Sequence, residues 1–232
     1  MRSKFAWEHL VGLVGLILFG VGSYLGLIVA PPERYMGQVG RILYVHVPTA
    51  WVAMAALTTA FVAAIGVLVT KRPRWDHVLV AAVEVGVVLT AMLLVQGSIW
   101  ARPTWGQYWT WDPRLTTSAI LLVAFAGVLG LRAFVDDPHR RAQWSAVATI
   151  VAYVDVPIVY FSVKWWRTIH QSFSTSESIS VSMKLPMHLN AAALLLIAAW
   201  LITRRARLAA LRRQHDEVTA PSPPSSNLVA GE

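Results

Sequence analysis

The chain has 232 residues, of which 56% are hydrophobic and only 14% are charged, and its mean hydropathy is +0.54. This composition argues against a water-soluble domain and indicates that the bilayer is the solvent. The formal net charge of +8 does not require nucleic acid, because basic membrane proteins carry their Lys and Arg residues on cytoplasmic loops. The chain has no cysteine, which excludes disulfides and thiolate metal sites.

Six segments have the roughly 20 mainly apolar residues that a transmembrane helix requires. They predict an all-α integral membrane protein, a six-transmembrane helix bundle, in which residues 1–205 form the membrane domain. Residues 206–232 are expected to be a cytoplasmic, disordered tail, rich in Pro and Ser from about Thr219. The first segment is too long for a signal peptide and lacks a small-residue cleavage site, so we expect a retained anchor. The segments lie at about 6–30, 45–70, 78–100, 115–135, 144–163 and 185–203.

The distribution of basic residues predicts the orientation of the bundle. With both termini in the cytoplasm, thirteen Lys and Arg residues fall on inner segments and seven on outer segments, which is the bias that the positive-inside rule expects. Seven outer cations beside aromatic residues are compatible with an anionic ligand, although short translocated loops also carry basic residues. The seven are Arg34, Arg41, Arg102, Arg114, Lys164, Arg167 and Lys184.

Four of the eleven tryptophans lie within twelve residues of each other, in an outer loop at about 101–114 between the third and fourth segments; they are Trp100, Trp105, Trp109 and Trp111. One interpretation is an interfacial belt, since indole rings favour the headgroup region. The other is a binding surface for a flat conjugated ligand. If residues 104–112 form a short helix on the membrane, then Trp105, Tyr108, Trp109 and Asp112 share one face of it. Asp112 followed by Pro113 is also typical of a helix N-cap, which predicts the start of the fourth span.

Three histidines are placed at or near the outer face, and their positions alone do not rank them as ligands. They are His46, His170 and His188, whereas His77, His139 and His215 fall on inner segments and His9 near the inner end of the first span.

Two carboxylates, Glu84 and Asp155, fall within predicted spans, where ionisable groups often mark function. They suggest proton-coupled transport, but their predicted depths differ by roughly 9 Å, so they do not form an obvious pair. We therefore expect each to bond a neighbouring helix or water, with Pro157 freeing a carbonyl near Asp155.

Three motifs carry a resemblance to a known family. Trp105-Gly-x-x-Trp109-x-Trp111-Asp112-x-Arg114-Leu-Thr resembles the signature of the tryptophan-rich "WWD" family of haem-handling membrane proteins. Tyr44-Val-His46-Val-Pro48-x-x-Trp51 and Trp165-Trp166-x-x-x-His170-Gln171 resemble the haem exporter protein C family of cytochrome c maturation. The resemblance covers residues 1 to about 205.

The resemblance implies a site for haem b, with His46 and His170 as axial ligands of the iron and His188 unassigned. The surrounding residues that it implies are Trp100, Trp105, Trp109, Trp111, Asp112 and Arg114. Haem propionates need cations, and Arg114 is favoured over Arg102, Arg41, Lys164 and Arg167 because it belongs to the signature.

The resemblance also implies a role in c-type cytochrome biogenesis, as a multi-pass protein of the bacterial inner membrane. The protein would present haem at the periplasmic face to a membrane-anchored haem chaperone, together with ATP-binding-cassette exporter subunits and a small single-span subunit. Such work is coordination and transfer, not enzymatic turnover. The missing cysteines exclude a Cys-x-x-Cys-His haem attachment site in the chain itself.

Three alternatives remain open. A cytochrome c synthase of the same family would usually bring additional spans or a large outer domain. A permease for haem or a small solute would place Glu84 and Asp155 along its path. A scaffold with a tryptophan belt would bind no ligand, and would be colourless when purified from haem-replete cells.

Overall fold

The computed structural model describes residues 2–171 and 181–219, and within these ranges the chain forms seven α-helices and two short helical turns. The α-helices are α1 (Arg2–Tyr24), α2 (Leu43–Thr70), α3 (Pro73–Trp105), α4 (Pro113–Ala133), α5 (Pro138–Tyr153), α6 (Asp155–Trp165) and α7 (Val181–Thr219). A π-helical turn, Leu25–Val29, extends α1, and a 3-10 turn, Gln38–Ile42, precedes α2.

The helices form six candidate membrane spans by length and composition, which confirms the predicted all-α, six-span membrane protein. The spans are Trp7–Val29, Gln38–Thr70, Pro73–Trp105, Pro113–Ala133, Pro138–Trp165 and Ser182–Asp216. Helices α5 and α6 share one span and are separated only at Val154. Pro157 has no N–H and its ring crowds the carbonyl four residues earlier, so it breaks the helix at this point.

Proline and aspartate define where the middle helices begin. Pro73, Pro113 and Pro138 each occupy the first turn of a helix, where a missing N–H costs nothing. Asp112 precedes α4 and its carboxylate accepts a hydrogen bond from the Arg114 backbone N–H at 2.9 Å. The predicted N-cap at Asp112 is therefore confirmed.

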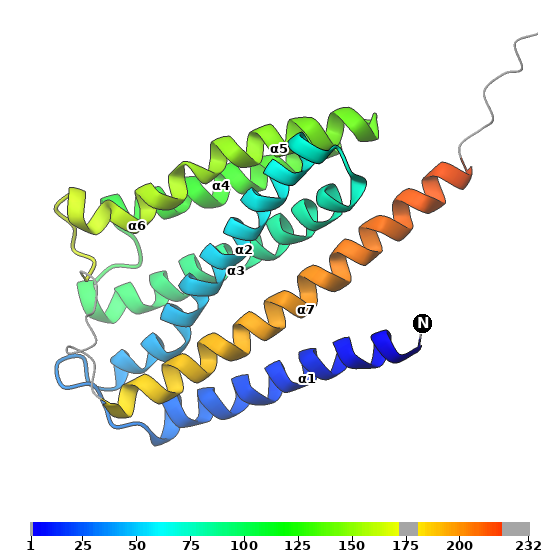
Figure 1. The fold of residues 1–232 in the computed structure, drawn as a ribbon. Helices are drawn as coiled ribbons and strands as arrows, with labels where there is room; N and C mark the ends of the chain where they lie inside the picture. Colours follow the sequence, from blue (N-terminus) through cyan, green and yellow to red (C-terminus); the bar gives the residue numbers. More distant parts are fainter. Residues whose placement is uncertain (1, 172–180, 220–232) are drawn as a thin grey trace, which may run out of the picture.

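Helices α2 and α3 pack against each other at the centre of the bundle and connect its two sides (Figure 1). On one side α1 lies along α7, and on the other α4 packs against α5 and α6. Small residues let the central helices approach closely, since Ala60, Ala63 and Ala64 of α2 are buried.

The bundle has two ends, which carry different parts of the chain (Figure 1). We call the end with residues 30–42, 106–112 and 166–171 the loop end. The opposite end, where α1 begins and α7 finishes, is the terminal end.

Two expectations differ from the structure. The proposed short helix over 104–112 is wrong, because α3 continues to Trp105 and stops at Gly106, which adopts a left-handed conformation (φ 80°), and residues 106–112 are not helical. Residues 206–219 of the expected disordered tail instead continue α7, since they are rich in Ala, Leu and Arg and the next proline is Pro221. Residues 220–232 of that tail lie outside the described residues.

Candidate functional site

A cavity of about 570 Å³ lies near the loop end, between α2, α3, α4, α6 and the start of α7. Six of the eight predicted site residues line it: His46, Trp100, Trp105, Trp109, Arg114 and His170. Trp111 and Asp112 do not line it. The cavity has the size of a small-molecule or cofactor site.

His46 stands in the first turn of α2, and its ring lies beside Gly97 and Trp100 of α3 in the wall of the cavity. Its ring lies 5.6 Å from the buried ring of Trp100, centroid to centroid, in an edge-on arrangement. Its Nδ1 atom is buried and has no hydrogen-bond partner among the described residues. Gly97 of α3 leaves room for the ring, since a Cβ atom at that position would lie 3.3 Å from His46 Cε1.

His170 reaches the same cavity from the segment that follows α6. Its Nδ1 atom lies 2.9 Å from the carbonyl oxygen of Gln171, so a neutral ring that donates from Nδ1 keeps the lone pair on Nε2. Burial is the largest cause that lowers the pKa of His170, and the positive charge of Arg114 lowers it further. The carbonyl of Gln171 and the charge of Asp112 act in the opposite direction. The net effect favours the neutral imidazole, which is the form that binds metals.

Asp112 positions the His170 segment. Besides capping α4, its carboxylate accepts hydrogen bonds from the Thr168 hydroxyl at 2.7 Å and from the Ile169 backbone N–H at 2.8 Å. Thr168 Oγ1 in turn accepts a hydrogen bond from the His170 backbone N–H at 3.1 Å. Asp112 therefore ties the tryptophan loop to the backbone beside His170, without lining the cavity.

The tryptophans divide between the cavity and the outer surface. Trp105 lies 6.5 Å from His170, ring to ring, so each predicted axial histidine has a cavity-lining indole beside it. Trp111 is 79% exposed and Tyr108 is 61% exposed, and neither lines the cavity. Trp111 contacts Trp109 edge-on at 5.8 Å. The end of α3 and the loop after it thus contain both cavity-lining rings and surface rings.

Arg114 lines the cavity and is anchored to α6. Its Nη1 atom donates to the backbone carbonyls of Val159 at 2.6 Å and Tyr160 at 3.2 Å. The other cations considered for an anionic ligand, Arg41, Arg102, Lys164 and Arg167, do not line the cavity.

Two lining residues of α7, Met183 and Met187, are absent from the sequence predictions. Lys184, Trp51 and His188 also line the cavity, and from the sequence they are an outer cation, a motif residue and an unassigned histidine. The rings of Trp51 and His188 lie 5.9 Å apart. The apolar wall on α3 was also missed, although Thr90, Leu93, Leu94, Gly97 and Trp100 recur at the three- and four-residue spacing of one helix face. That spacing is the signal that could have found it.

The two carboxylates in the spans behave differently from each other. Glu84 forms a bidentate ion pair with Arg205 of α7, with distances of 2.6 and 2.7 Å, which confirms that it bonds a neighbouring helix. Asp155 begins α6, and its Oδ2 atom is buried without a hydrogen-bond partner in the described part of the chain.

The comparisons with known proteins give one family. The family described as Heme exporter protein C matches residues 2–220. The chain is 37% identical to the Heme exporter protein C of Bradyrhizobium diazoefficiens, over 86% of this chain and 77% of the relative. It is 35% identical to the Haemophilus influenzae protein of that name, over 88% and 84%. A putative cytochrome c biosynthesis ccmC-like mitochondrial protein of Marchantia polymorpha is 34% identical, over 76% and 77%.

These matches span nearly all of the membrane bundle, including the helices and loops that build the cavity. The chain belongs to the heme exporter protein C family.

Proposed function

We propose that the chain binds haem b in the loop-end cavity, with His46 and His170 as the two axial ligands of the iron. The observation that carries the proposal is that two imidazoles, from α2 and from the segment after α6, line one cavity. Both histidines belong to motifs whose resemblance to the family implies axial ligation. The supporting geometry includes the neutral form favoured for His170 and the unpartnered Nδ1 of His46.

A bare metal ion is a poorer fit than a metalloporphyrin. In the described ranges no group of three or more His, Cys, Asp or Glu side chains is arranged to hold a metal ion. Two imidazoles suffice, however, for an iron whose other four ligands come from a porphyrin. The apolar wall and the indoles of Trp100, Trp105 and Trp109 suit the flat macrocycle of such a ligand.

Two cations of the cavity suit the propionates of haem. Arg114 uses Nη1 to bond α6, which fixes its guanidinium at the cavity wall with further N–H donors. Lys184 lines the cavity from α7. Of the two cations, we assign Arg114 as the main partner of the haem propionates, through charge-assisted hydrogen bonds. Its backbone N–H is also held by Asp112, which fixes the position of the residue.

The cellular role that we propose is haem handling in c-type cytochrome biogenesis. The protein would sit in the bacterial inner membrane with both termini in the cytoplasm, so that the loop end faces the periplasm and presents haem there. The receiving partner would be a membrane-anchored haem chaperone, and the protein would act with ATP-binding-cassette exporter subunits and a small single-span subunit. Family membership and the bias of basic residues toward the terminal end support this role.

The visible spectrum of the purified protein tests the ligand assignment. We expect a six-coordinate Soret band from the wild type, and a shifted or missing band from His46→Ala and from His170→Ala. His139→Ala is the control, since His139 is exposed in the first turn of α5 at the terminal end. Added imidazole is expected to restore the band in either alanine variant. Unchanged haem content in both variants would contradict the assignment.

A further inference from the structure

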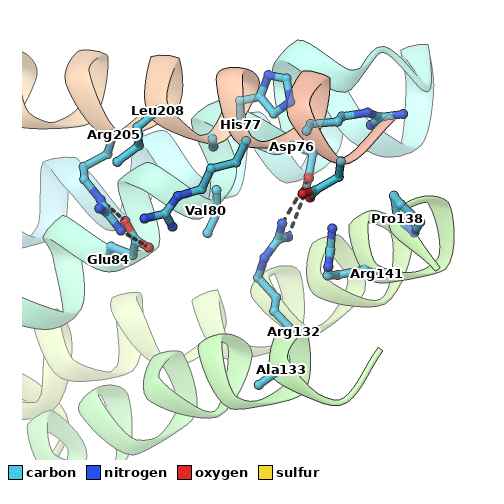
Figure 2. Close-up of a pocket in the computed structure, with 14 residues that line it drawn as sticks. Asp76, His77, Val80, Glu84, Arg132, Ala133, Pro138, Arg141, Arg205 and Leu208 are labelled. Carbon is cyan, nitrogen blue, oxygen red and sulfur yellow. Dashed lines mark hydrogen bonds and ion pairs between the residues drawn. The ribbon is translucent and has the colours of Figure 1, made fainter. Parts of the chain in front are cut away.

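A second cavity, of about 360 Å³, lies at the terminal end and shares no lining residue with the loop-end cavity. Figure 2 shows it in close-up. Its walls come from α3, α4, α5 and α7, and it is strongly charged. Five arginines and three carboxylates line it: Arg132, Arg141, Arg205, Arg212, Arg213, Asp76, Glu84 and Asp216. The lining therefore has an excess of positive charge.

Two of the carboxylates are already neutralised. Asp76, which is buried, accepts two hydrogen bonds from Arg132, at 2.6 and 3.0 Å. Glu84 is held in the same bidentate manner by Arg205. Figure 2 shows these two pairs on different walls of the cavity. Each of these two carboxylates therefore already has one arginine as its partner.

Arg141 forms no ion pair within the part of the chain that the structure describes. It projects from α5 toward the space that Arg132 reaches from α4 (Figure 2). Its Nε atom is buried and has no hydrogen-bond acceptor among residues 2–171 and 181–219. A buried N–H without an acceptor is costly, and more so on a charged group. This geometry points to an acceptor that comes from outside the chain.

The depth of the cavity indicates the chemistry of that acceptor. Asp76 lies in the first turn of α3 and Arg132 in the last turn of α4, so the cavity is at the end of the spans, where lipid headgroups lie. Basic pockets between transmembrane helices at this depth bind phosphate headgroups. Guanidinium groups match the oxygen atoms of phosphate geometrically.

We propose that the terminal-end cavity binds a phosphate group on Arg141 and the exposed rim arginine Arg212, supplied by an anionic phospholipid or by free phosphate. The exposed carboxylate Asp216 also lines the cavity and would repel a phosphate group. The five lining arginines outnumber the three carboxylates, so the net charge of the lining still attracts phosphate. The phosphate site is separate from the proposed haem cavity. Both leaflets of the bilayer contain headgroup phosphate, so the phosphate proposal does not depend on which way the bundle is oriented in the membrane.

The test compares full-length variants in two arms, with phosphatidylglycerol and inorganic phosphate as probes. Arg141→Gln removes the guanidinium whose Nε lacks an acceptor among the described residues. Arg140→Gln is the matched control, because Arg140 is exposed and does not line the cavity. Native mass spectrometry counts phosphatidylglycerol retained from mixed micelles with phosphatidylcholine. Thermal unfolding in detergent records stabilisation by inorganic phosphate.

A lipid site predicts that Arg141→Gln retains about tenfold less phosphatidylglycerol than the wild type and Arg140→Gln. A free-phosphate site predicts equal lipid retention, with phosphate raising the melting temperature of the wild type and Arg140→Gln but not of Arg141→Gln. Equal behaviour of the wild type, Arg140→Gln and Arg141→Gln in both arms would overturn the proposal.

Arg212→Gln keeps the test decisive if Arg141→Gln does not fold, because Arg212 is exposed and its replacement leaves the packing of the bundle intact. We expect it to weaken binding in the same arm. If Arg141→Gln does not fold and the folded Arg212→Gln binds phosphate as the wild type does, the proposed site is rejected as well. The haem spectrum serves as the independent check that each variant is folded.

Discussion

At the scale of single residues, Asp112 connects the tryptophan loop with the histidine segment. Its one carboxylate accepts hydrogen bonds from the Arg114 and Ile169 backbone N–H groups and from the Thr168 hydroxyl, and the last two donors lie in the segment that carries His170. Asp112 therefore acts on the site by fixing the position of His170, as residues that hydrogen-bond near a metal-binding histidine commonly do.

Asp112→Asn is expected to weaken haem binding about tenfold, because the amide NH₂ cannot accept the hydrogen bond from the Ile169 N–H. Haem titration followed at the Soret band measures the change. Thr110→Val is the matched control from the same loop, since the Thr110 hydroxyl is buried and makes no hydrogen bond with the described residues. Equal loss in both variants would show that the loop, not the carboxylate, is what matters.

The protonation of His170 gives a prediction on pH. Its folded pKa is lowered, so the unfolded chain binds more protons. The stability contributed by His170 is fully present above the unfolded pKa of about 6.5 and declines as the pH falls below that value. Haem held by the neutral imidazole is therefore expected to persist through pH 6.5 and to be released at lower pH.

Arg114→Gln is expected to move this acid release to higher pH, because the charge of Arg114 is one of the causes that lower the pKa of His170. An acid titration of the Soret band gives the midpoint. Arg102→Gln, which alters an outer cation away from the cavity, is expected to keep the wild-type midpoint. An unchanged or lower midpoint for Arg114→Gln would contradict the electrostatic explanation.

At the scale of helices, glycines set how closely the spans approach each other. A Cβ atom on Gly22 of α1 would lie 2.3 Å from Asn190 Oδ1 of α7. Asn190 is buried, and its Nδ2 atom donates to the Tyr44 carbonyl of α2 at 2.8 Å. One close approach therefore joins three helices at the loop end.

Gly22→Ala is expected to destabilise the protein by about 1–3 kcal/mol, because the added methyl group must displace Asn190. Its neighbour Gly20 has nothing within 4 Å of the corresponding Cβ position, so Gly20→Ala is expected to be neutral. Thermal unfolding in detergent distinguishes the two variants. Similar melting temperatures for the two variants would mean that α1 and α7 can move apart to admit the methyl group without loss of stability.

Gly97→Ala tests the approach of α3 to His46. The new methyl group would lie 3.3 Å from His46 Cε1, which is tight enough to turn the ring. We expect haem affinity to fall about fivefold, with the helix itself no less stable. Gly127→Ala in α4, where a Cβ atom meets nothing within 4 Å, is the control. Wild-type affinity for Gly97→Ala would indicate that His46 has freedom to move.

At the scale of the whole molecule, the two ends of the bundle differ in chemistry. The loop-end cavity is lined by three histidines and by aromatic rings, whereas the terminal end holds ion pairs between helices. The pairing of Glu84 with Arg205 also gives this carboxylate a structural role, as the spacing of Glu84 and Asp155 suggested. A permease with Glu84 as its proton carrier would have to break that pair.

Asp76→Asn is expected to lower stability by about 3 kcal/mol, because it leaves the partly buried guanidinium of Arg132 without its counter-charge. The haem spectrum of the folded protein is expected to stay unchanged, since distant sites contribute independently. Asp136→Asn, at an exposed position between α4 and α5, controls for the loss of a negative charge. A changed Soret band in Asp76→Asn would instead show that the two ends are coupled.

The sequence by itself determined the six spans and the start of α4 at Asp112. Span length, the proline positions and the N-cap are local properties, so a linear reading finds them. The motifs also identified six residues that line the cavity. The end of α3 at Trp105 was not predicted, although Gly106 offered a signal for it.

Only the tertiary structure decided which of these side chains meet. Asp112 bonds Thr168 and Ile169 across more than fifty residues, and His188 and Lys184 join the cavity because α7 packs against α2 and α3. The exposure of Trp111 and the Nε atom of Arg141, which has no partner among the described residues, likewise depend on how the helices pack. Contacts between helices arise from packing in three dimensions, and helical periodicity specifies a face without specifying its partner.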